Sequence, residues 1–166
     1  MCHAPGSFYV SPFKKAALLS IDGSGEWATT WLGYGDGIEI KSISESYFPN
    51  SLGSFYMAIT QYCGFRINYD EGKTMGLAPM GNYRTYYDKI EPLVKIDAEG
   101  RVNLDLDYFA LQNMSWEQLS SKFINEFGPS RLHDEDFGDH HMDLAAAFQR
   151  VLEDKVLEIC NVLYER

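Results

Sequence analysis

Three short segments of the chain hold residue types that could do chemistry. Asp22 ends an apolar run and opens Asp-Gly-Ser-Gly, residues 22–25, where small residues let backbone amides approach a phosphate closely. His3 lies upstream, and an imidazole with a carboxylate suits a divalent metal such as Fe²⁺ or Zn²⁺. The third segment, residues 71–81, is rich in glycine and contains Lys73, which could neutralise a phosphate as a point charge.

Each of these segments also has a simpler interpretation. Asp-Gly is the commonest signal for a hairpin turn, and a histidine near a chain end often has no role. Glu71 and Lys73 could be an ion pair that ties their segment together. The glycine spacing around Lys73 differs from a Walker A loop. His140 and His141 are adjacent, so on a helix they point about 100° apart, and we expect a cap or surface role for them.

The elements that must position these residues begin with a meander. Residues 16–44 alternate apolar runs with two glycine-rich turns, which predicts three antiparallel strands. A helix over residues 51–63 follows, capped by Asn50 or Ser51 and stopped by Gly64. Residues 66–83 lack periodicity, so we predict an ordered loop there. Its apolar side chains, namely Met75, Leu77 and Met80, are expected to be buried.

The second half of the chain alternates helices with one hairpin. A short helix is predicted over residues 83–91 and a hairpin over 94–106. Ser115 and Gln118 form a capping box for a helix that ends at Gly128. Residues 130–139 are polar and expected to be exposed. Apolar residues then repeat at helical spacing over residues 139–164, which predicts a long amphipathic helix.

Composition limits the function classes. The chain has 166 residues and a net charge of −10, which disfavours extended binding to nucleic acid. Its apolar runs are shorter than the roughly 20 residues that span a bilayer, and its N-terminus does not resemble a signal peptide. Three cysteines, Cys2, Cys63 and Cys160, lie far apart; Cys63 and Cys160 fall in apolar helical patterns that predict burial. These features favour a reducing, cytoplasmic setting without membrane partners.

Five ordered motifs together resemble one family. They are His-Ala-x-x-Ser-Phe-Tyr-x-Ser-Pro-Phe at 3–13, Ile-Asp-Gly-Ser-Gly-Glu-Trp-Ala-Thr-Thr at 21–30, Phe-Pro-x-Ser-Leu-Gly at 48–53, Glu-x-Lys-x-Met-Gly-Leu-Ala-Pro at 71–79 and His-Met-Asp-Leu-Ala-Ala at 141–146. In this order they resemble the N-terminal domain of the NodU-type O-carbamoyltransferases. The resemblance covers nearly the whole chain. It implies a mixed α/β structure that is part of an actin/Hsp70-like (ribonuclease H-like) ATPase fold, with the meander packed on helices.

The resemblance also implies a reaction. A carbamoyl group would pass from carbamoyl phosphate, through a carbamoyl-adenylate made with ATP, to a hydroxyl of a small molecule such as a nodulation factor or an antibiotic. His3 and Asp22 match two metal ligands of the family, with Fe²⁺ expected and Zn²⁺ or Mg²⁺ as alternatives. The residues matching the nucleotide and phosphate site are Gly23, Ser24, Gly25, Glu71 and Lys73.

The resemblance further implies that this chain is a piece of a longer enzyme. A first metal-binding histidine, a later aspartate, the opening strand and a YrdC-like C-terminal domain would lie outside it. We therefore expect the chain alone to be inactive, to bind metal weakly and to self-associate as a dimer or larger species. Two alternatives remain open. One is a kinase or acyl-phosphate transferase on the same ATPase fold, and the other is a binding module without catalysis.

Overall fold

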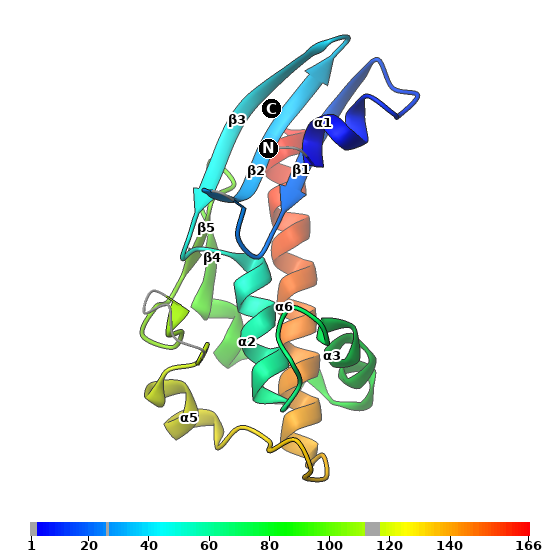
Figure 1. Cartoon of the computed structure of the whole chain (residues 1–166). Coiled ribbons are helices and arrows are strands. Elements are labelled where there is room, and N and C mark those ends of the chain that lie inside the picture. The colour runs from blue at the N-terminus through cyan, green and yellow to red at the C-terminus, as the bar shows by residue number, and fades with distance from the viewer. Residues whose placement is uncertain (1–2, 26, 112–116) are drawn as a thin grey trace.

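A three-stranded antiparallel sheet forms the upper part of the molecule (Figure 1). The computed structural model describes residues 3–25, 27–111 and 117–166. The strands are β1 (Lys15–Ile21), β2 (Ala28–Asp36) and β3 (Glu39–Tyr47), and β2 lies between the other two. This order confirms the predicted meander. In its register Trp31 faces Ser20 on β1 and Glu45 on β3.

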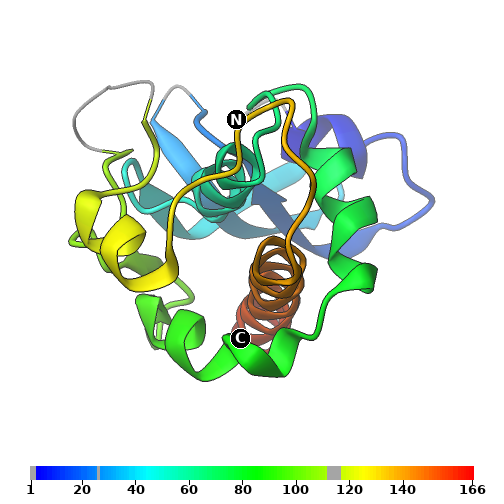
Figure 2. The same cartoon turned by 90° about the horizontal axis from the view of Figure 1, so that it is seen from below.

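The two faces of the sheet are covered by different helices. Side chains alternate between faces along a strand, so the fully buried Leu32 joins the main core while its neighbour Trp31 faces the other way. Helices α2 (Leu52–Tyr62) and α6 (Asp139–Tyr164) cover the inner face (Figures 1 and 2). The short helix α1 (His3–Phe8) covers the outer face, where the Phe8 ring lies directly against Gly35.

The main core lies between α2 and α6. Phe55 and Phe148 are both fully buried and stack with their ring centroids 4.4 Å apart. Helix α2 begins where predicted, because the Ser51 side chain accepts a hydrogen bond from the Ser54 N–H. It ends at Tyr62, with Cys63 as the C-cap, and the next residue, Gly64, has a φ of +72° that favours glycine. The predicted helices over 51–63 and 139–164 are therefore confirmed.

The predicted loop over residues 66–83 is wrong in its centre. Residues Glu71–Leu77 form helix α3, and Ala78–Met80 form the 3₁₀ helix η1. Two glycines in α3 hid its helical pattern, but packing overrides their low propensity, and the buried Thr74 hydroxyl donates to the Thr60 hydroxyl on α2 over 3.0 Å. Leu77 is buried as expected. Met75 and Met80 are exposed, contrary to the prediction.

The segment after η1 holds several short turns instead of one helix. They are η2 (Tyr83–Thr85), α4 (Tyr87–Ile90) and η3 (Glu91–Leu93). The predicted hairpin is confirmed as β4 (Val94–Ile96) and β5 (Val102–Leu104), which pair antiparallel. Helix α5 (Ser121–Phe127) begins later than predicted, with Ser120 as its N-cap. The proposed capping residue Ser115 lies outside the described residues.

The polar segment before α6 is anchored rather than fully exposed. Arg131 is buried, and its Nε donates to the Cys63 carbonyl over 2.7 Å. His141 acts as the expected cap: its Nδ1 accepts the Gly138 N–H over 3.1 Å at the start of α6.

The two described cysteines differ in their surroundings. Burial raises the pKa of the Cys63 thiol to about 12. Cys160 is exposed, because it lies on the solvent side of α6 and not on the predicted buried side.

Within the described residues, the helices are too short or too polar to cross a membrane.

Candidate functional site

His3 and Asp22 meet at the outer face of the sheet. Helix α1 carries His3 across the end of β1, where its Nε2 lies 3.5 Å from Asp22 Oδ1. The Ser20 hydroxyl donates to the other carboxylate oxygen, Oδ2, over 3.2 Å. The Asp22 N–H donates to the Thr29 carbonyl over 2.8 Å, which extends the β1–β2 pairing. One carboxylate oxygen is thus held by Ser20, while the other is directed at His3.

A hollow of about 440 Å³ opens beside this pair. Its volume falls in the range of small-molecule sites, roughly 300–1,000 Å³. The cross-strand row of Ser20, Trp31 and Glu45 contributes to its wall. The complete lining is His3, Ala4, Ser20, Asp22, Ser24, Gly25, Trp27, Ala28, Thr29, Thr30, Trp31 and Glu45. The side chain of His3 is 76% exposed and that of Asp22 34%, so both are open to a ligand from solvent.

The loop after Asp22 is docked on the start of α2. The Ser51 hydroxyl lies 2.9 Å from the Asp22 carbonyl oxygen and 2.7 Å from that of Gly23. Ser54 donates to the Gly23 carbonyl over 3.2 Å. A Cβ at Gly53 would lie 2.6 Å from the Gly23 Cα, so only glycine lets the loop approach this closely. The Phe-Pro-x-Ser-Leu-Gly motif therefore positions the Asp22 loop.

The amide donors of residues 23–25 are only partly available. The Gly25 N–H donates to the Ala28 carbonyl over 3.1 Å and closes the turn. It would have to leave that partner in order to bind a phosphate. Ser24 and Gly25 line the hollow, whereas Gly23 turns toward Met57 of α2. The segment thus serves as the hairpin turn considered above and also as one rim of the hollow.

Glu71 and Lys73 lie elsewhere, on α3. Lys73 Nζ forms an ion pair of 3.0 Å with Asp70, which lowers the pKa of that carboxyl mainly through the hydrogen bond from Lys73. Glu71 Oε1 accepts the Asn68 N–H over 2.6 Å. Neither side chain lines the hollow. The structure therefore brings His3, Asp22, Ser24 and Gly25 together and leaves Glu71 and Lys73 apart from them.

The His3–Asp22 pair fits one part of a metal site. Ligand bonds of about 2.0–2.2 Å place two ligand atoms of one ion roughly 2.8–3.5 Å apart, and the observed separation of 3.5 Å is at that limit. A nitrogen and a carboxylate oxygen are suitable donors for Fe²⁺ or Zn²⁺. Among the described residues, a cluster of three or more histidine, cysteine or acidic ligands does not occur. The pair would supply two ligands, and further ligands would have to come from outside these residues.

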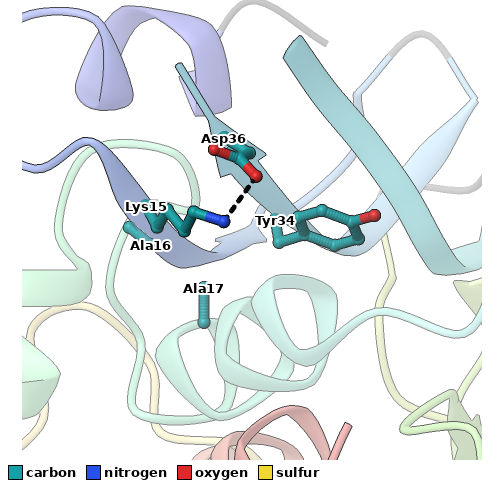
Figure 3. Close-up of a pocket in the computed structure, with 6 residues that line it drawn as sticks. Lys15, Ala16, Ala17, Tyr34 and Asp36 are labelled. Atoms are coloured by element: carbon teal, nitrogen blue, oxygen red, sulfur yellow. Dashed lines mark ion pairs between the residues drawn. The ribbon is translucent and has the colours of Figure 1, made fainter.

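A second hollow, of about 400 Å³, lies near the other end of β1 (Figure 3). Lys15 Nζ and Asp36 Oδ2 form an ion pair of 2.8 Å there, and the ring of Tyr34 lies beside it. The hydrogen bond to Asp36 raises the pKa of Lys15. Because its two charged groups neutralise each other, this hollow offers less chemistry than the one beside Asp22.

Sequence reasoning missed Ser20, Trp31, Glu45 and Ser51 as parts of the site. The first three share a row only in the actual register, and two irregularities interrupt the β2–β3 pairing. A β-bulge shifts which side chains face each other, so alternation alone could not place Glu45 opposite Trp31. Ser51 had a usable signal, since it was predicted as a cap and lies in the Phe-Pro-x-Ser-Leu-Gly motif.

Comparison with known proteins defines the family. Residues 1–166 match the family described as carbamoyltransferase N-terminus, and the chain belongs to that family. An uncharacterized protein of Synechocystis sp. is 41% identical over 98% of this chain and 26% of its own length. Nodulation protein NolNO of Sinorhizobium fredii is 29% identical over 96% of this chain and 22% of its own length. An uncharacterized protein of Methanocaldococcus jannaschii is 30% identical over the whole chain and 28% of its own length.

The chain thus spans about a quarter of the length of these curated relatives. The resemblance to carbamoyltransferases is confirmed at the level of the family, and the mixed α/β structure with antiparallel sheets is confirmed by the fold.

Proposed function

We propose that this chain is part of an ATP-dependent O-carbamoyltransferase and that its His3–Asp22 pair belongs to the transfer site. The observation that carries the proposal is the convergence of these two residues at 3.5 Å beside an open hollow, in a chain of the carbamoyltransferase family. The donor would be carbamoyl phosphate, activated with ATP as a carbamoyl-adenylate, and the acceptor a hydroxyl of a small molecule. We therefore favour a transferase over a binding module without catalysis.

The proposed step is an acyl-type substitution at the carbamoyl carbon. The acceptor oxygen forms a bond to that carbon, the bond from the carbon to the AMP phosphate oxygen breaks, and AMP leaves with the electron pair. The hydroxyl proton passes to water at the open side of the hollow. His3 Nε2 and Asp22 Oδ1 would hold a divalent metal, Fe²⁺, Zn²⁺ or Mg²⁺, and its charge would polarise a carbonyl and lower the pKa of a hydroxyl. Ser20 keeps the Asp22 carboxylate in the required orientation through its 3.2 Å hydrogen bond.

The remaining predicted residues take more distant roles in this proposal. Gly23, Ser24 and Gly25 would contact the adenylate phosphate after the turn has opened at Gly25. Lys73 would reach that phosphate only if it left Asp70, with Glu71 keeping the start of α3 in place. The mixed α/β unit would be part of an actin/Hsp70-like ATPase fold. A cytoplasmic location and self-association of the chain stay predictions.

The decisive experiment replaces Asp22 in a full-length protein that contains this chain. Asp22→Asn keeps the size of the side chain and removes its charge, so carbamoyl transfer to the acceptor should be lost. Adenylate formation, followed as pyrophosphate release from ATP, should continue. Asp36→Asn is the matched control, because Asp36 is an aspartate of the same sheet outside the hollow.

Full transfer by the Asp22→Asn enzyme would refute the assignment. A wild-type protein that binds ligands but transfers no carbamoyl group would favour the binding-module alternative.

A further inference from the structure

The hollow beside Asp22 has an acidic lining. Its lining contains two carboxylates, Asp22 and Glu45, and the described lining residues include neither lysine nor arginine. The whole chain carries a net charge of −10. Carboxylates repel a phosphate and attract groups that donate hydrogen bonds. The hollow therefore suits the acceptor better than the phosphate-bearing donor.

Glu45 lies ready to accept hydrogen bonds from a ligand. Its Oε1 accepts from the Ser42 hydroxyl over 3.1 Å and its Oε2 from the Tyr47 hydroxyl over 3.0 Å. These two bonds orient the carboxylate, and each carboxylate oxygen can still accept another. Because Ser20, Trp31 and Glu45 form one row across β1, β2 and β3, Glu45 lies on the β3 side of the hollow and Asp22 on the β1 side.

Trp31 in the same row has an unused donor. The residue is only 4% exposed, and its indole Nε1 is buried without a hydrogen-bond partner in the part of the chain that the structure describes. An unpaired buried donor is costly, so a shift of the ring that let a ligand atom in the hollow accept from Nε1 would be favoured. An ammonium group cannot accept this bond. A hydroxyl can accept from Trp31 and donate to Glu45 at the same time.

Trp27 adds an apolar surface at the rim. It lines the hollow, yet 79% of the residue is exposed, which is unusual for so large an apolar side chain. An indole face can pack against the apolar face of a ring while hydroxyls at the ring edge reach polar partners. The hollow thus combines one aromatic surface with separate groups that accept and donate hydrogen bonds.

We infer that this hollow is the acceptor site, that it takes a neutral molecule with several hydroxyl groups, and that Glu45 is a specificity-determining residue for it. The inference rests on the proposed function for the identity of the reaction. One hydroxyl would lie at Asp22 for transfer, and another would lie between Trp31 and Glu45. The phosphate of the donor would lie at the rim formed by Ser24 and Gly25, and not between Trp31 and Glu45.

Binding to the 166-residue chain tests the inference without requiring turnover. The indole N–H signals of Trp27 and Trp31 are assigned in ¹H–¹⁵N spectra with the variants Trp27→Phe and Trp31→Phe. Titration with myo-inositol, a neutral polyol, should shift the Trp31 signal saturably. AMP and inorganic phosphate represent the donor, and putrescine represents a cationic ligand. None of these three compounds should shift the Trp31 signal.

Glu45→Gln should weaken inositol binding about tenfold, because a hydrogen bond to a charged acceptor becomes one to a neutral amide. Glu39→Gln is the control, since Glu39 starts the same strand and pairs with Lys41 away from the hollow. Saturable binding of AMP, phosphate or putrescine at Trp31 in place of inositol would overturn the inference. The absence of any saturable inositol shift would also overturn it.

The two proposals can fail separately. If Asp22→Asn abolishes transfer in the full-length protein but inositol does not bind here, the acceptor site is wrong and the proposed function stands. If inositol binds in a Glu45-dependent way but the full-length protein transfers no carbamoyl group, the polyol site stands without that function.

Discussion

The two faces of the three-stranded sheet have contrasting surroundings. The inner face packs on α2 and α6, where Leu32, Phe55 and Phe148 are fully buried in one continuous core. The outer face has a small apolar cluster between α1 and the sheet, next to the open hollow with Asp22 and Glu45; its members are Ala4, Phe8, Leu18 and Trp31. The polar groups of the candidate site therefore stay near solvent and avoid the desolvation that the inner face would impose.

The comparison shows how stability and chemistry are divided within one sheet. The inner face stabilises the strands, so the outer face can keep carboxylates, an exposed tryptophan and an indole donor that has no partner among the described residues. The loop of residues 22–25 joins the two regions, because it ends β1 and is bonded to the start of α2.

The largest expected effect comes from the inner face. Phe148→Ala should lower the free energy of unfolding by about 3–5 kcal/mol, since it removes a fully buried ring that stacks on Phe55. Urea unfolding measures the loss. Phe8→Ala on the outer face should lower the free energy of unfolding less, because the six-residue helix α1 can detach locally while the core stays folded. Equal losses for the two variants would contradict the division between the faces.

The junction between the faces should show an intermediate effect. Ser51→Ala removes the N-cap of α2 and the hydrogen bonds to the Asp22 loop, and should lower the free energy of unfolding by about 1–2 kcal/mol. Ser24→Ala on the same loop is the control, because Ser24 is exposed. A change below the error of the urea experiment for Ser51→Ala would show that the loop does not depend on α2.

Acid should lower the free energy of unfolding through His141, which lies near the start of α6. Burial lowers the pKa of His141 below its usual value of 6.5, with smaller contributions from His140 and Arg131. The unfolded chain therefore binds a proton more readily than the folded one. The contribution of His141 to stability is present above about pH 6.5 and is lost as the pH falls through the lower folded-state pKa.

Thermal melting between pH 7 and pH 5 tests this assignment. Relative to wild type, His141→Asn should show a smaller decrease in melting temperature over that range. His133→Asn is the control, because its side chain is 91% exposed. Identical pH dependence of wild type and His141→Asn would contradict the role of His141.

The smallest effect belongs to the exposed start of the edge strand β1. Lys15→Met removes the exposed ion pair with Asp36, and it should leave the urea midpoint within experimental error. A clear decrease would show that this end of β1 contributes more to stability than its exposure suggests.

The sequence predicted the elements whose pattern is local. The long apolar repeat of α6, the cap at Ser51 and the Gly64 stop made both main helices predictable. Helix α3 was not predictable, because Gly72 and Gly76 interrupt its pattern and its packing on α2 is non-local. Cys160 was placed on the wrong side of α6, since one position of error rotates a residue by about 100°.

The candidate site was predictable only in part for the same reason. Asp22 stood out through its Asp-Gly turn, and His3 was linked to it by family resemblance. Glu45 and Trp31 became neighbours only through strand register. Lys73 had the charge expected of a phosphate ligand, yet it pairs with Asp70, the N-cap residue of its own helix.

Ser51 performs two tasks with one hydroxyl group, and the two tasks are chemically separable. As an acceptor it caps α2 at the Ser54 N–H, and as a donor it holds the carbonyl groups of Asp22 and Gly23. A single proton serves two carbonyl oxygens, and the Ser54 hydroxyl adds a separate hydrogen bond to the Gly23 carbonyl. An aspartate at position 51 could cap the helix but could not donate, and it would repel the same carbonyls. Ser51→Asp would therefore leave the helix start capped and the loop held on α2 by the Ser54 hydrogen bond alone, so that the mobility of the Asp22 loop could be varied separately from the helix cap.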